Sequence, residues 1–375
     1  MVIAVNTRLL LPGKMEGIGW FTYENLRRIT VNHPEHQFIF IFDRKYDEKF
    51  IFNSNVTPVI ANPPSRHPIL WYLFFEYGVP PVLKKFKADL FFSPDGWLSL
   101  RTKVKSLPVI HDLNFMHEPQ WVSRAPRYYY NHFFPKFAQK ANRIATVSEF
   151  SKQDITNRFQ ISPENIDVVY NGANESYTPI NNEEKNDTRK RFSKSEEYFL
   201  FVGLVHPRKN LTRIIRAFNI YKQKTGRKEK LIIVGSTAYW TSDTSNAFEN
   251  SAYKDDIIFV GRLEPIDLHK VFASAKVLVF ASLFEGFGIP ILESMYCDVP
   301  VITSDATSMP EIGGEAAIYV DPYSTDSIAE AMIKITADEN LYNDLIVKGR
   351  VQRRKFSWDN SASLVWNAIE KTLEQ

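Results

Sequence analysis

Short apolar runs alternate with helical patterns along nearly all of this 375-residue chain, and that alternation restricts the fold to a narrow class. Runs rich in β-branched and aromatic residues predict strands. In the first half they are VIAVNT, FIFIF, DLFFS, LPVIHD, RIATVS and IDVVYN; in the second half they are YFLFVG, KLIIVG, IIFVG, AKVLVFAS and VPVITS. Segments such as WFTYENLRRIT and NLTRIIRAFNIYKQK predict helices between them. Such alternation is typical of parallel sheets covered by helices, so we predict two α/β domains.

The length and one polar stretch divide the chain. Domains typically hold about 100 to 200 residues, so two is the natural number. The turn-rich segment NGANESYTPINNEEKNDTRKRFSKSEE separates the two halves and is the predicted linker. We predict an N-terminal domain over residues 1–175 and a C-terminal domain over residues 176–355.

Composition limits the partners. A net charge of +3 is too small to argue for nucleic acid, but the charge is unevenly spread. Residues 84–143 hold 11 Lys and Arg against 4 Asp and Glu, and they include the aromatic and basic run RAPRYYYNHFFPKFAQKANR. This run suits peripheral contact with an anionic lipid surface or a phosphate-bearing acceptor. A helix with core aromatics and solvated lysines explains it equally well.

The sequence favours a cytoplasmic protein. No apolar stretch reaches the roughly 20 residues of a membrane span, because Glu76 and two prolines interrupt the richest one, PILWYLFFEYGVPPVL. The opening MVIAVNTRLLL lacks the pattern of a secretory signal. Cys297 is the single cysteine, so no intrachain disulfide is expected. Peripheral contact with the inner face of the membrane remains an alternative.

Ligands of open parallel sheets bind beyond the carboxyl ends of the strands, so the loops after the apolar runs are candidate sites. In LLPGKMEGIGWFTYENL, Gly17 and Gly19 lie before a helix and would let backbone amides approach a phosphate. The spacing matches neither G-x-G-x-x-G nor the Walker pattern, so an ordinary loop is the alternative. His111, in VIHDLNF, suits a hydrogen bond to a substrate hydroxyl or a role as a structural histidine.

Two loops of the second half carry charge. Arg208 and Lys209, in FLFVGLVHPRKNLTRI, lie at a helix entrance and suit a diphosphate, or are surface cations. In LFEGFGIPILESM, Glu285 and Glu293 flank a glycine turn, and Pro290 predicts a helix start that puts Glu293 in the first turn. There Glu293 would bind a sugar hydroxyl or stabilise the helix by about 0.3 to 1 kcal/mol. The segment VPVITSDATSMPEIGGEAAIYVDP is expected to line the same cleft.

Several motifs occur together and in order: VIHDL, TVSEFSKQDI, HPRKNL, EGFGIPILE, PVITSDATSMPEIGGEAA and FSW. Together they resemble the family 4 glycosyltransferases, retaining enzymes of GT-B fold with two Rossmann-like domains facing across a cleft. The likeness covers nearly the whole chain and is weakest over residues 50–105, where acceptor recognition usually lies. It also implies that residues 356–375 form a helix returning to the N-terminal domain, and that domain closure completes the site.

The resemblance assigns roles to the residues of the segment LFEGFGIPILESM. Glu285 matches the family's glutamate on the donor sugar's hydroxyls, and Glu293 matches the one on the nucleotide ribose. The backbone amides of Gly286, Phe287 and Gly288 are expected to hold the sugar.

It assigns the remaining site residues too. Lys209, with Arg208 beside it, matches the cationic clamp on the diphosphate. Gly17 and Gly19 match the glycine loop that closes over that diphosphate, and His111 matches the histidine near the sugar's primary hydroxyl and the reacting carbon. Lys209, His111 and Glu285 are the expected catalytic residues.

The chain departs from the family pattern at three positions. Leu204 stands where members often carry an arginine, so the diphosphate is expected to depend on Arg208 instead. Cys297 and Asp298 replace a small residue and a glycine, and Asp298 is expected to alter a helix end.

The resemblance implies transfer of a hexose, of the mannose type or similar, from a nucleoside diphosphate sugar to a hydroxyl with retention of anomeric configuration. The aromatic and basic first domain makes a glycan or lipid-linked glycan of surface polysaccharide or lipopolysaccharide synthesis the expected acceptor, with a soluble acceptor as the alternative. No Asp-x-Asp occurs, so we expect no metal, no other cofactor and activity that EDTA does not affect.

Alternatives are a GT-B nucleotide-sugar epimerase or hydrolase and a non-catalytic sugar-nucleotide-binding protein. The intact set of Glu285, Glu293, Lys209 and His111 argues against the second. A nicotinamide oxidoreductase is disfavoured because no G-x-G-x-x-G opens either half.

Overall fold

The computed structural model describes residues 1–174 and 176–375, which divide into two compact units. Unit 1 comprises Met1–Gly172 and Ser357–Gln375, and unit 2 comprises Ala173–Phe356. The predicted end of the first domain, residue 175, lies outside the described residues. None of the described helices combines the length and apolar character that a membrane span requires.

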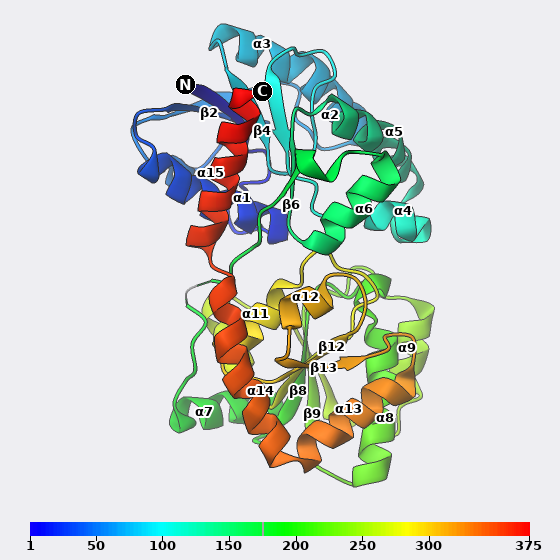
Figure 1. Ribbon diagram of the computed structural model, residues 1–375. Helices are drawn as coiled ribbons and strands as arrows, with labels where there is room; N and C mark the ends of the chain where they lie inside the picture. Colours follow the sequence, from blue (N-terminus) through cyan, green and yellow to red (C-terminus); the bar gives the residue numbers. More distant parts are fainter. Residues whose placement is uncertain (175) are drawn as a thin grey trace. The chain divides into compact units, whose positions relative to one another are not determined.

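Unit 1 is a parallel sheet with helices around it (Figure 1). Its strands are β1 (Val2–Asn6), β2 (Gln37–Phe42), β3 (Val56–Ile60), β4 (Leu90–Ser93), β5 (Lys105–Pro108), β6 (Ile144–Thr146) and β7 (Ile166–Val168). Its helices are α1 (Gly17–Asn32), α2 (Pro68–Leu73), α3 (Val79–Lys85), α4 (Asn114–His117), α5 (Arg124–Lys140), α6 (Glu149–Phe159) and α15 (Trp358–Glu374).

The five-stranded sheet has the order β3-β2-β1-β4-β5, and every pair is parallel. Strands β6 and β7 form a separate parallel pair, which an isolated bridge between Val109 and Ala145 connects to the end of β5. The chain winds outward from β1 to β3 and then returns to place β4 on the other side of β1. The strand order therefore reverses between β1 and β4, and the crevice at the carboxyl ends of such a pair is where open sheets bind ligands.

Unit 2 repeats this architecture. Its strands are β8 (Tyr198–Val202), β9 (Lys230–Val234), β10 (Ile257–Gly261), β11 (Val277–Phe280), β12 (Val301–Ser304) and β13 (Ala317–Val320). Its helices are α7 (Asn182–Ser193), α8 (Leu211–Thr225), α9 (Ser242–Glu249), α10 (Pro265–Ser274), α11 (Ile289–Tyr296), α12 (Met309–Gly313), α13 (Thr325–Ala337) and α14 (Glu339–Gln352). The order β10-β9-β8-β11-β12-β13 reverses between β8 and β11. The predicted pair of parallel-sheet α/β domains is confirmed.

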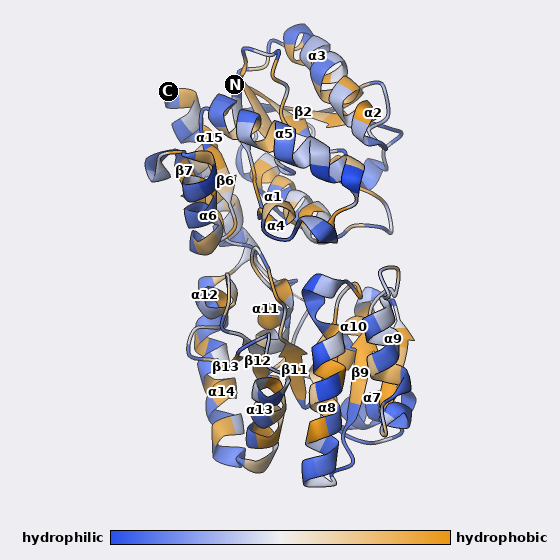
Figure 2. Cartoon of the chain, turned by 90° about the vertical axis from the view of Figure 1, so that its right-hand side faces the viewer, coloured by the Kyte–Doolittle hydropathy of each residue, from blue (hydrophilic) through white to orange (hydrophobic). Residues whose placement is uncertain are grey.

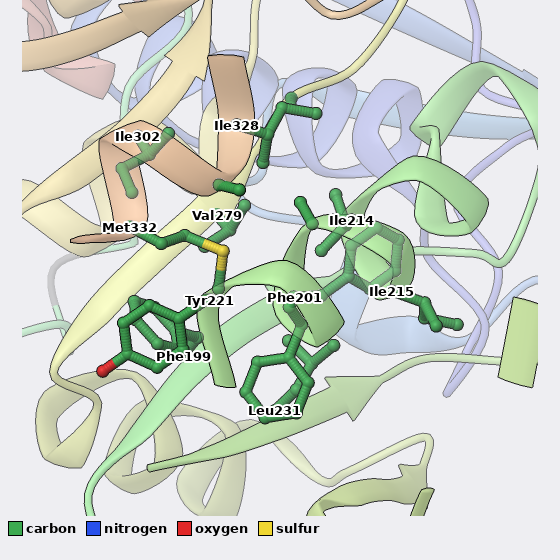
Figure 3. Close-up of a cluster of buried hydrophobic side chains, with 14 of the residues drawn as sticks. Phe199, Phe201, Ile214, Ile215, Tyr221, Leu231, Val279, Ile302, Ile328 and Met332 are labelled. Carbon is green, nitrogen blue, oxygen red and sulfur yellow. The ribbon is translucent and has the colours of Figure 1, made fainter. Parts of the chain in front are cut away.

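Apolar side chains of the unit 2 strands pack with those of the covering helices and form the core of the unit. Phe199 and Phe201 of β8 pack in one buried cluster with Ile214 and Tyr221 of α8 and with Met332 of α13 (Figure 3). Strands β9 and β11 are orange in Figure 2, whereas α8 carries both orange and blue residues. This is the pattern of a buried parallel sheet covered by amphipathic helices.

Strands β3 and β13, each at one edge of its sheet, were not predicted from the sequence. Strand β3 contains Pro58, which cannot donate a ladder hydrogen bond and is tolerated in a sheet only at an edge or a bulge. Strand β13 is the short segment Ala317–Val320 at the other unit's edge. Edge strands are buried less completely than central ones, so their sequences carry a weaker apolar signal.

The predicted linker is partly wrong, because its second half is the helix α7. Asn181 begins this helix by accepting a hydrogen bond from the backbone N–H of Glu184, which satisfies one of the donors at the helix start. Arg191 forms an ion pair with Asp267 of α10 at 2.9 Å. The strongly charged composition concealed a helix that is held by its cap and by its contact with α10.

The C-terminal helix α15 belongs to unit 1 (red in Figure 1). Ser357 caps it by accepting a hydrogen bond from the N–H of Asn360. The helix packs along α1, where Arg28 Nε lies 2.5 Å from Asp359 Oδ1.

Candidate active site

Two loops meet at the reversal point of the unit 2 sheet, one after β8 and one after β11. The buried side chain of Asn210 donates hydrogen bonds to the carbonyls of Ala281, at 2.9 Å, and Pro322, at 2.7 Å. Its φ of 61° is left-handed, a conformation that asparagine tolerates better than most residues. The N–H of Leu283 donates to the carbonyl of Arg208. Asn210 therefore ties the two loops together, a role that the sequence analysis missed although an asparagine at a helix entrance is a recognisable signal.

The loops bring Arg208, Lys209 and Glu285 into one charge cluster. Arg208 Nη1 lies 2.5 Å from Glu285 Oε2, and Lys209 Nζ lies 2.7 Å from Glu285 Oε1. Burial would raise the pKa of Glu285, but the two cations outweigh it and lower this pKa to about 2. Glu285 is therefore an ionised carboxylate at neutral pH.

Lys209 lies in a closely packed pocket of side chains. Its Nζ is 4.6 Å from the centre of the Phe280 ring. A Cβ on Gly203 would lie 3.4 Å from Lys209 Cε, an ordinary van der Waals distance, so the φ of +141° rather than a lack of space favours glycine at this position. These contacts fix the ammonium group beside Glu285.

The glycine turn after Glu285 is held by the loop that follows β12. Ser308 Oγ donates to the carbonyls of Glu285, at 2.9 Å, and Phe287, at 3.1 Å, with Gly286 between them. Thr307 Oγ1 accepts a hydrogen bond from the N–H of Glu285. The segment that the sequence analysis placed in the same cleft thus positions the turn through two hydroxyl groups.

The predicted place of Glu293 in the first turn of its helix is wrong. Helix α11 begins at Ile289, with Gly288 at φ +101° before it, and Pro290 is its second residue. Glu293 is the fifth residue of the helix. It therefore lies past the first turn, which is the part of a helix where a negative charge is favoured. The interpretation as a helix-start stabiliser therefore fails.

Glu293 differs electrostatically from Glu285. Burial raises the pKa of Glu293 to about 7, although a hydrogen bond from Tyr177 and the charge of Lys209 act in the opposite direction. Lys209 thus interacts with both glutamates but forms an ion pair with Glu285. Near neutral pH a large share of Glu293 side chains carries a proton.

The predicted glycines of unit 1 lie within α1, not before it, because the helix starts at Gly17. A Cβ on Gly19 would come 3.0 Å from the Leu9 carbonyl oxygen, so this position requires a close backbone approach. A Cβ on Gly17 would meet nothing within 4 Å. Gly19 therefore has a packing reason to be glycine, whereas Gly17 has none within the described part of the chain.

His111 lies after β5, and its ring packs edge-on against Phe21 of α1. Its Nε2 is 2.8 Å from the carbonyl oxygen of Pro94, an acceptor, so Nε2 carries the hydrogen in the neutral ring. Burial lowers the pKa of His111, while that hydrogen bond and the Asp112 carboxylate act against the shift. The imidazole is therefore neutral at pH 7, with Nδ1 as a hydrogen-bond acceptor.

The aromatic and basic run forms helix α5, which buries some of its aromatic side chains and exposes others. Phe134 and Phe137 are buried in the core of unit 1, whereas Tyr128 is 65% exposed. Tyr128 lines an open hollow on the helix surface with Arg124 and Arg127.

Residues 182–352 match the family Glycosyl transferases group 1, and residues 22–177 match Glycosyltransferase Family 4. The chain belongs to the family 4 glycosyltransferases. It is therefore an enzyme of the glycosyltransferase type, with the GT-B fold.

Three known proteins illustrate the relationship. The chain is 26% identical over 289 residues to O-antigen chain mannosyltransferase B of Escherichia coli, covering 77% of this chain and 76% of the relative. It is 26% identical over 331 residues to O-antigen chain mannosyltransferase RfbU of Salmonella typhimurium, covering 87% and 88%. The crystal structure of Anabaena HepE in complex with UDP-glucose superimposes with a TM-score of 0.77 at 14% identity, covering 99% of this chain and 100% of HepE.

The departures from the family pattern have structural counterparts. Asp298 follows α11 at φ 57° and forms ion pairs with Arg350 of α14 and with Arg353, which follows that helix. Cys297 is buried beside it. Among the residues that the structure describes, no group of three or more His, Cys, Asp or Glu side chains could hold a metal ion.

Proposed function

We propose that this enzyme transfers a hexose, of the mannose type, from a nucleoside diphosphate sugar to a hydroxyl group of a glycan or lipid-linked acceptor in surface polysaccharide synthesis. The observation that carries the proposal is the cluster of Arg208, Lys209 and Glu285 at the reversal point of the unit 2 sheet. The two mannosyltransferase relatives support the sugar class, and HepE, crystallised with UDP-glucose, supports a nucleotide-sugar donor.

The charge cluster suits a donor with one anionic and one polyhydroxylated part. The diphosphate would take the hydrogen-bond donors of Arg208 and Lys209, which releases Glu285 Oε atoms to accept hydrogen bonds from sugar hydroxyls. Negative charge grows on the leaving diphosphate oxygen in the transition state, and removing one well-placed donor there costs about 3 to 4 kcal/mol. Catalysis in this proposal is therefore mainly electrostatic.

The proposal assigns roles to two further residues. His111 would accept a hydrogen bond from the sugar's primary hydroxyl at Nδ1, because Nε2 is occupied by the Pro94 carbonyl. Glu293 would accept a hydrogen bond from the ribose. Retention of configuration, independence from metal ions and a diphosphate that receives the acceptor's proton are parts of the same proposal.

The acceptor and the compartment are also proposed. The exposed Tyr128 and the basic side chains of Arg124 and Arg127 would hold unit 1 at an anionic lipid surface. This would place a cytoplasmic enzyme at the inner face of the membrane, where lipid-linked glycans are extended.

Nucleotide binding provides the direct test. Thermal unfolding is followed with UDP, GDP, ADP and NAD, first with EDTA and then with magnesium. A ligand at 100 times its dissociation constant adds about 2.7 kcal/mol to the free energy of unfolding, so the correct base should stand out. We expect a shift with one nucleoside diphosphate that EDTA does not change. A shift with NAD alone, or none, would refute the proposal.

Lys209→Ala tests the catalytic step. Turnover is expected to fall by at least two orders of magnitude, whereas the dissociation constant of the nucleotide rises less, because the lysine acts mainly on charge that develops during transfer. Lys276→Ala is the matched control, since Lys276 also forms a partly buried ion pair, with Glu197, before β11. Equal losses of turnover and of nucleotide affinity in Lys209→Ala would contradict the assigned role. If the only product is free sugar, the enzyme is a nucleotide-sugar hydrolase. If the only product is an epimerised nucleotide sugar, it is an epimerase.

A further inference from the structure

The reversal point of the unit 1 sheet carries a second ion pair between a cation and a carboxylate. Arg8 follows β1, and Asp95 follows β4, the two strands between which the strand order reverses. Unit 2 has its cluster of Arg208, Lys209 and Glu285 at the corresponding point. The proposed donor chemistry uses the unit 2 cluster and leaves the unit 1 pair without a function.

The pair is buried and rigidly held. Arg8 Nε lies 2.5 Å from Asp95 Oδ2, and the two side chains are 9% and 4% exposed. Asp95 Oδ1 accepts hydrogen bonds from Asn6, at 2.7 Å, and from Ser93, at 3.2 Å. Apolar residues of similar volume would often be as stabilising as such a buried pair, so stability alone is a weak explanation for it.

Among the described residues, the guanidinium group of Arg8 uses only part of its N–H donors in hydrogen bonds. A guanidinium group carries five N–H donors. Nε donates to Asp95, and Nη1 lies 3.5 Å from Ser65 Oγ. Within residues 1–174 and 176–375, no other acceptor is hydrogen-bonded to this guanidinium.

Aromatic side chains surround the guanidinium. Its Cζ lies 5.4 Å from the ring centre of Phe75, 5.9 Å from that of Trp71 and 6.0 Å from that of Trp97. Trp71 is half-buried, and its ring nitrogen donates a hydrogen bond to the carbonyl of Ser65. An aromatic face beside hydrogen-bonding groups suits a sugar ring, which has an apolar C–H face and a rim of hydroxyls.

We propose that Arg8 and Asp95 form the subsite that binds the acceptor as a neutral sugar ring, with Arg8 donating hydrogen bonds to its hydroxyls and Trp71 contacting its face. The proposal rests on the transferase function proposed above. Asp95 neutralises Arg8, so the subsite lacks the net positive charge that a phosphate group on the acceptor would require. His111 lies next to it, since its Nε2 contacts the carbonyl of Pro94, the residue before Asp95.

The test compares two variants with a matched control in the full-length protein. Arg8→Gln removes the guanidinium, and Asp95→Asn removes its fixed carboxylate partner. Arg143→Gln is the control, because Arg143 and Asp167 of the same unit form a similarly buried ion pair, with Nε and Oδ2 2.7 Å apart. This pair does not lie at the carboxyl ends of β1 and β4. The probes are the methyl glycosides of mannose, glucose, galactose and N-acetylglucosamine, with mannose 6-phosphate as the anionic comparison. Binding is followed by ligand-observed NMR, and nucleoside diphosphate affinity is measured separately.

We expect at least one neutral glycoside to bind the unmodified protein and to bind Arg8→Gln at least tenfold more weakly. Asp95→Asn should weaken the same glycoside at least threefold. Arg143→Gln should leave the glycoside affinity unchanged, and all three variants should keep the nucleotide affinity. If Arg8→Gln does not fold, Asp95→Asn decides the question.

Several results would overturn the subsite. They are the absence of binding by every neutral glycoside, tighter binding of mannose 6-phosphate, unchanged glycoside affinity in the variants, and an equal loss in Arg143→Gln. Failure of the transferase proposal is a separate result, because it would appear as the absence of nucleoside diphosphate binding by the unmodified protein.

Discussion

Glu285 and Glu293 lie eight positions apart, yet their surroundings give them opposite protonation behaviour. Glu285 has two cations in direct contact, and its pKa falls to about 2. Glu293 has a tyrosine hydroxyl and a more distant lysine, so the effect of burial dominates and its pKa rises to about 7. The same side chain thus supplies a permanent carboxylate at one position and a group that titrates near neutral pH at the other.

Glu293→Gln should make the protein more stable in mildly alkaline solution. The pKa of Glu293 rises from an ordinary value of 4.5 to about 7, so the fold favours the protonated carboxyl. This contribution is fully present below about pH 4.5 and is lost as the pH rises through 7. Relative to the unmodified protein, the variant should gain about 3 kcal/mol at pH 8 and almost nothing at pH 4.5. Urea unfolding across this pH range measures the difference.

At pH 8, where Glu293 is mostly a carboxylate, the same substitution should reduce nucleotide affinity by about tenfold, because an amide is a weaker hydrogen-bond acceptor for the ribose. Glu330→Gln, on the exposed face of α13, is the control for loss of a glutamate charge. A stability difference between Glu293→Gln and the unmodified protein that is independent of pH would contradict the assigned environment of Glu293.

At the level of elements, single polar residues fix how strand ends and loops meet. Asn210 connects the helix entrance after β8 to the ends of β11 and β13, and Ser308 holds the turn after Glu285 from the loop after β12. Neither residue belongs to the predicted chemistry. Both determine where Lys209 and Glu285 lie.

Asn210→Ala is expected to destabilise the protein by about 3 kcal/mol, since two carbonyls lose their donor and alanine must adopt a left-handed backbone. Asn210→Gly keeps the backbone freedom and loses only the two hydrogen bonds, so it should recover about 1 kcal/mol. Turnover should fall in both variants because the cations after β8 lose their fixed position. Urea unfolding and steady-state kinetics measure these effects, and full activity in Asn210→Gly would show that the hydrogen bonds do not position the site.

At the level of the molecule, unit 1 is built from two separate stretches of chain. Its last helix, α15, follows all of unit 2 in sequence and buries Val365, Trp366 and Ile369. Trp366 stacks on His33 of the segment after α1, with ring centres 3.6 Å apart. The stability of unit 1 therefore depends on helix α15.

Ending the chain after Phe356 should unfold unit 1 and leave unit 2 intact. Removal of α15 exposes core residues of unit 1, whereas every element of unit 2 remains. Calorimetry should show loss of one transition, and the nucleoside diphosphate should still stabilise the remaining one while sugar transfer disappears. Lys371→Ala, which changes an exposed residue of α15, is the control. Loss of nucleotide binding in the truncated protein would show that unit 2 does not fold independently.

Local pattern was sufficient for the architecture. Buried parallel strands need continuous apolar runs, and their covering helices need an amphipathic repeat, so each element appears in its own stretch of residues. The exceptions were the edge strands β3 and β13 and the charged helix that begins after Asn181, where a neighbouring strand or a packed helix compensates for a weak local signal. The family motifs are also short stretches of sequence, and their order along the chain identified the glycosyltransferase family.

The contacts of the site depended on the tertiary structure, because its partners are distant in the chain. Arg208 and Glu285 come from different loops, and Arg8 meets Asp95 across 87 positions of sequence. Nothing in the residues around Arg8 indicates its partner, since the pair exists only because β1 and β4 are neighbours in the sheet. The pKa values of Glu285 and Glu293 have the same origin, as burial and charge at a carboxylate depend on the packing around it.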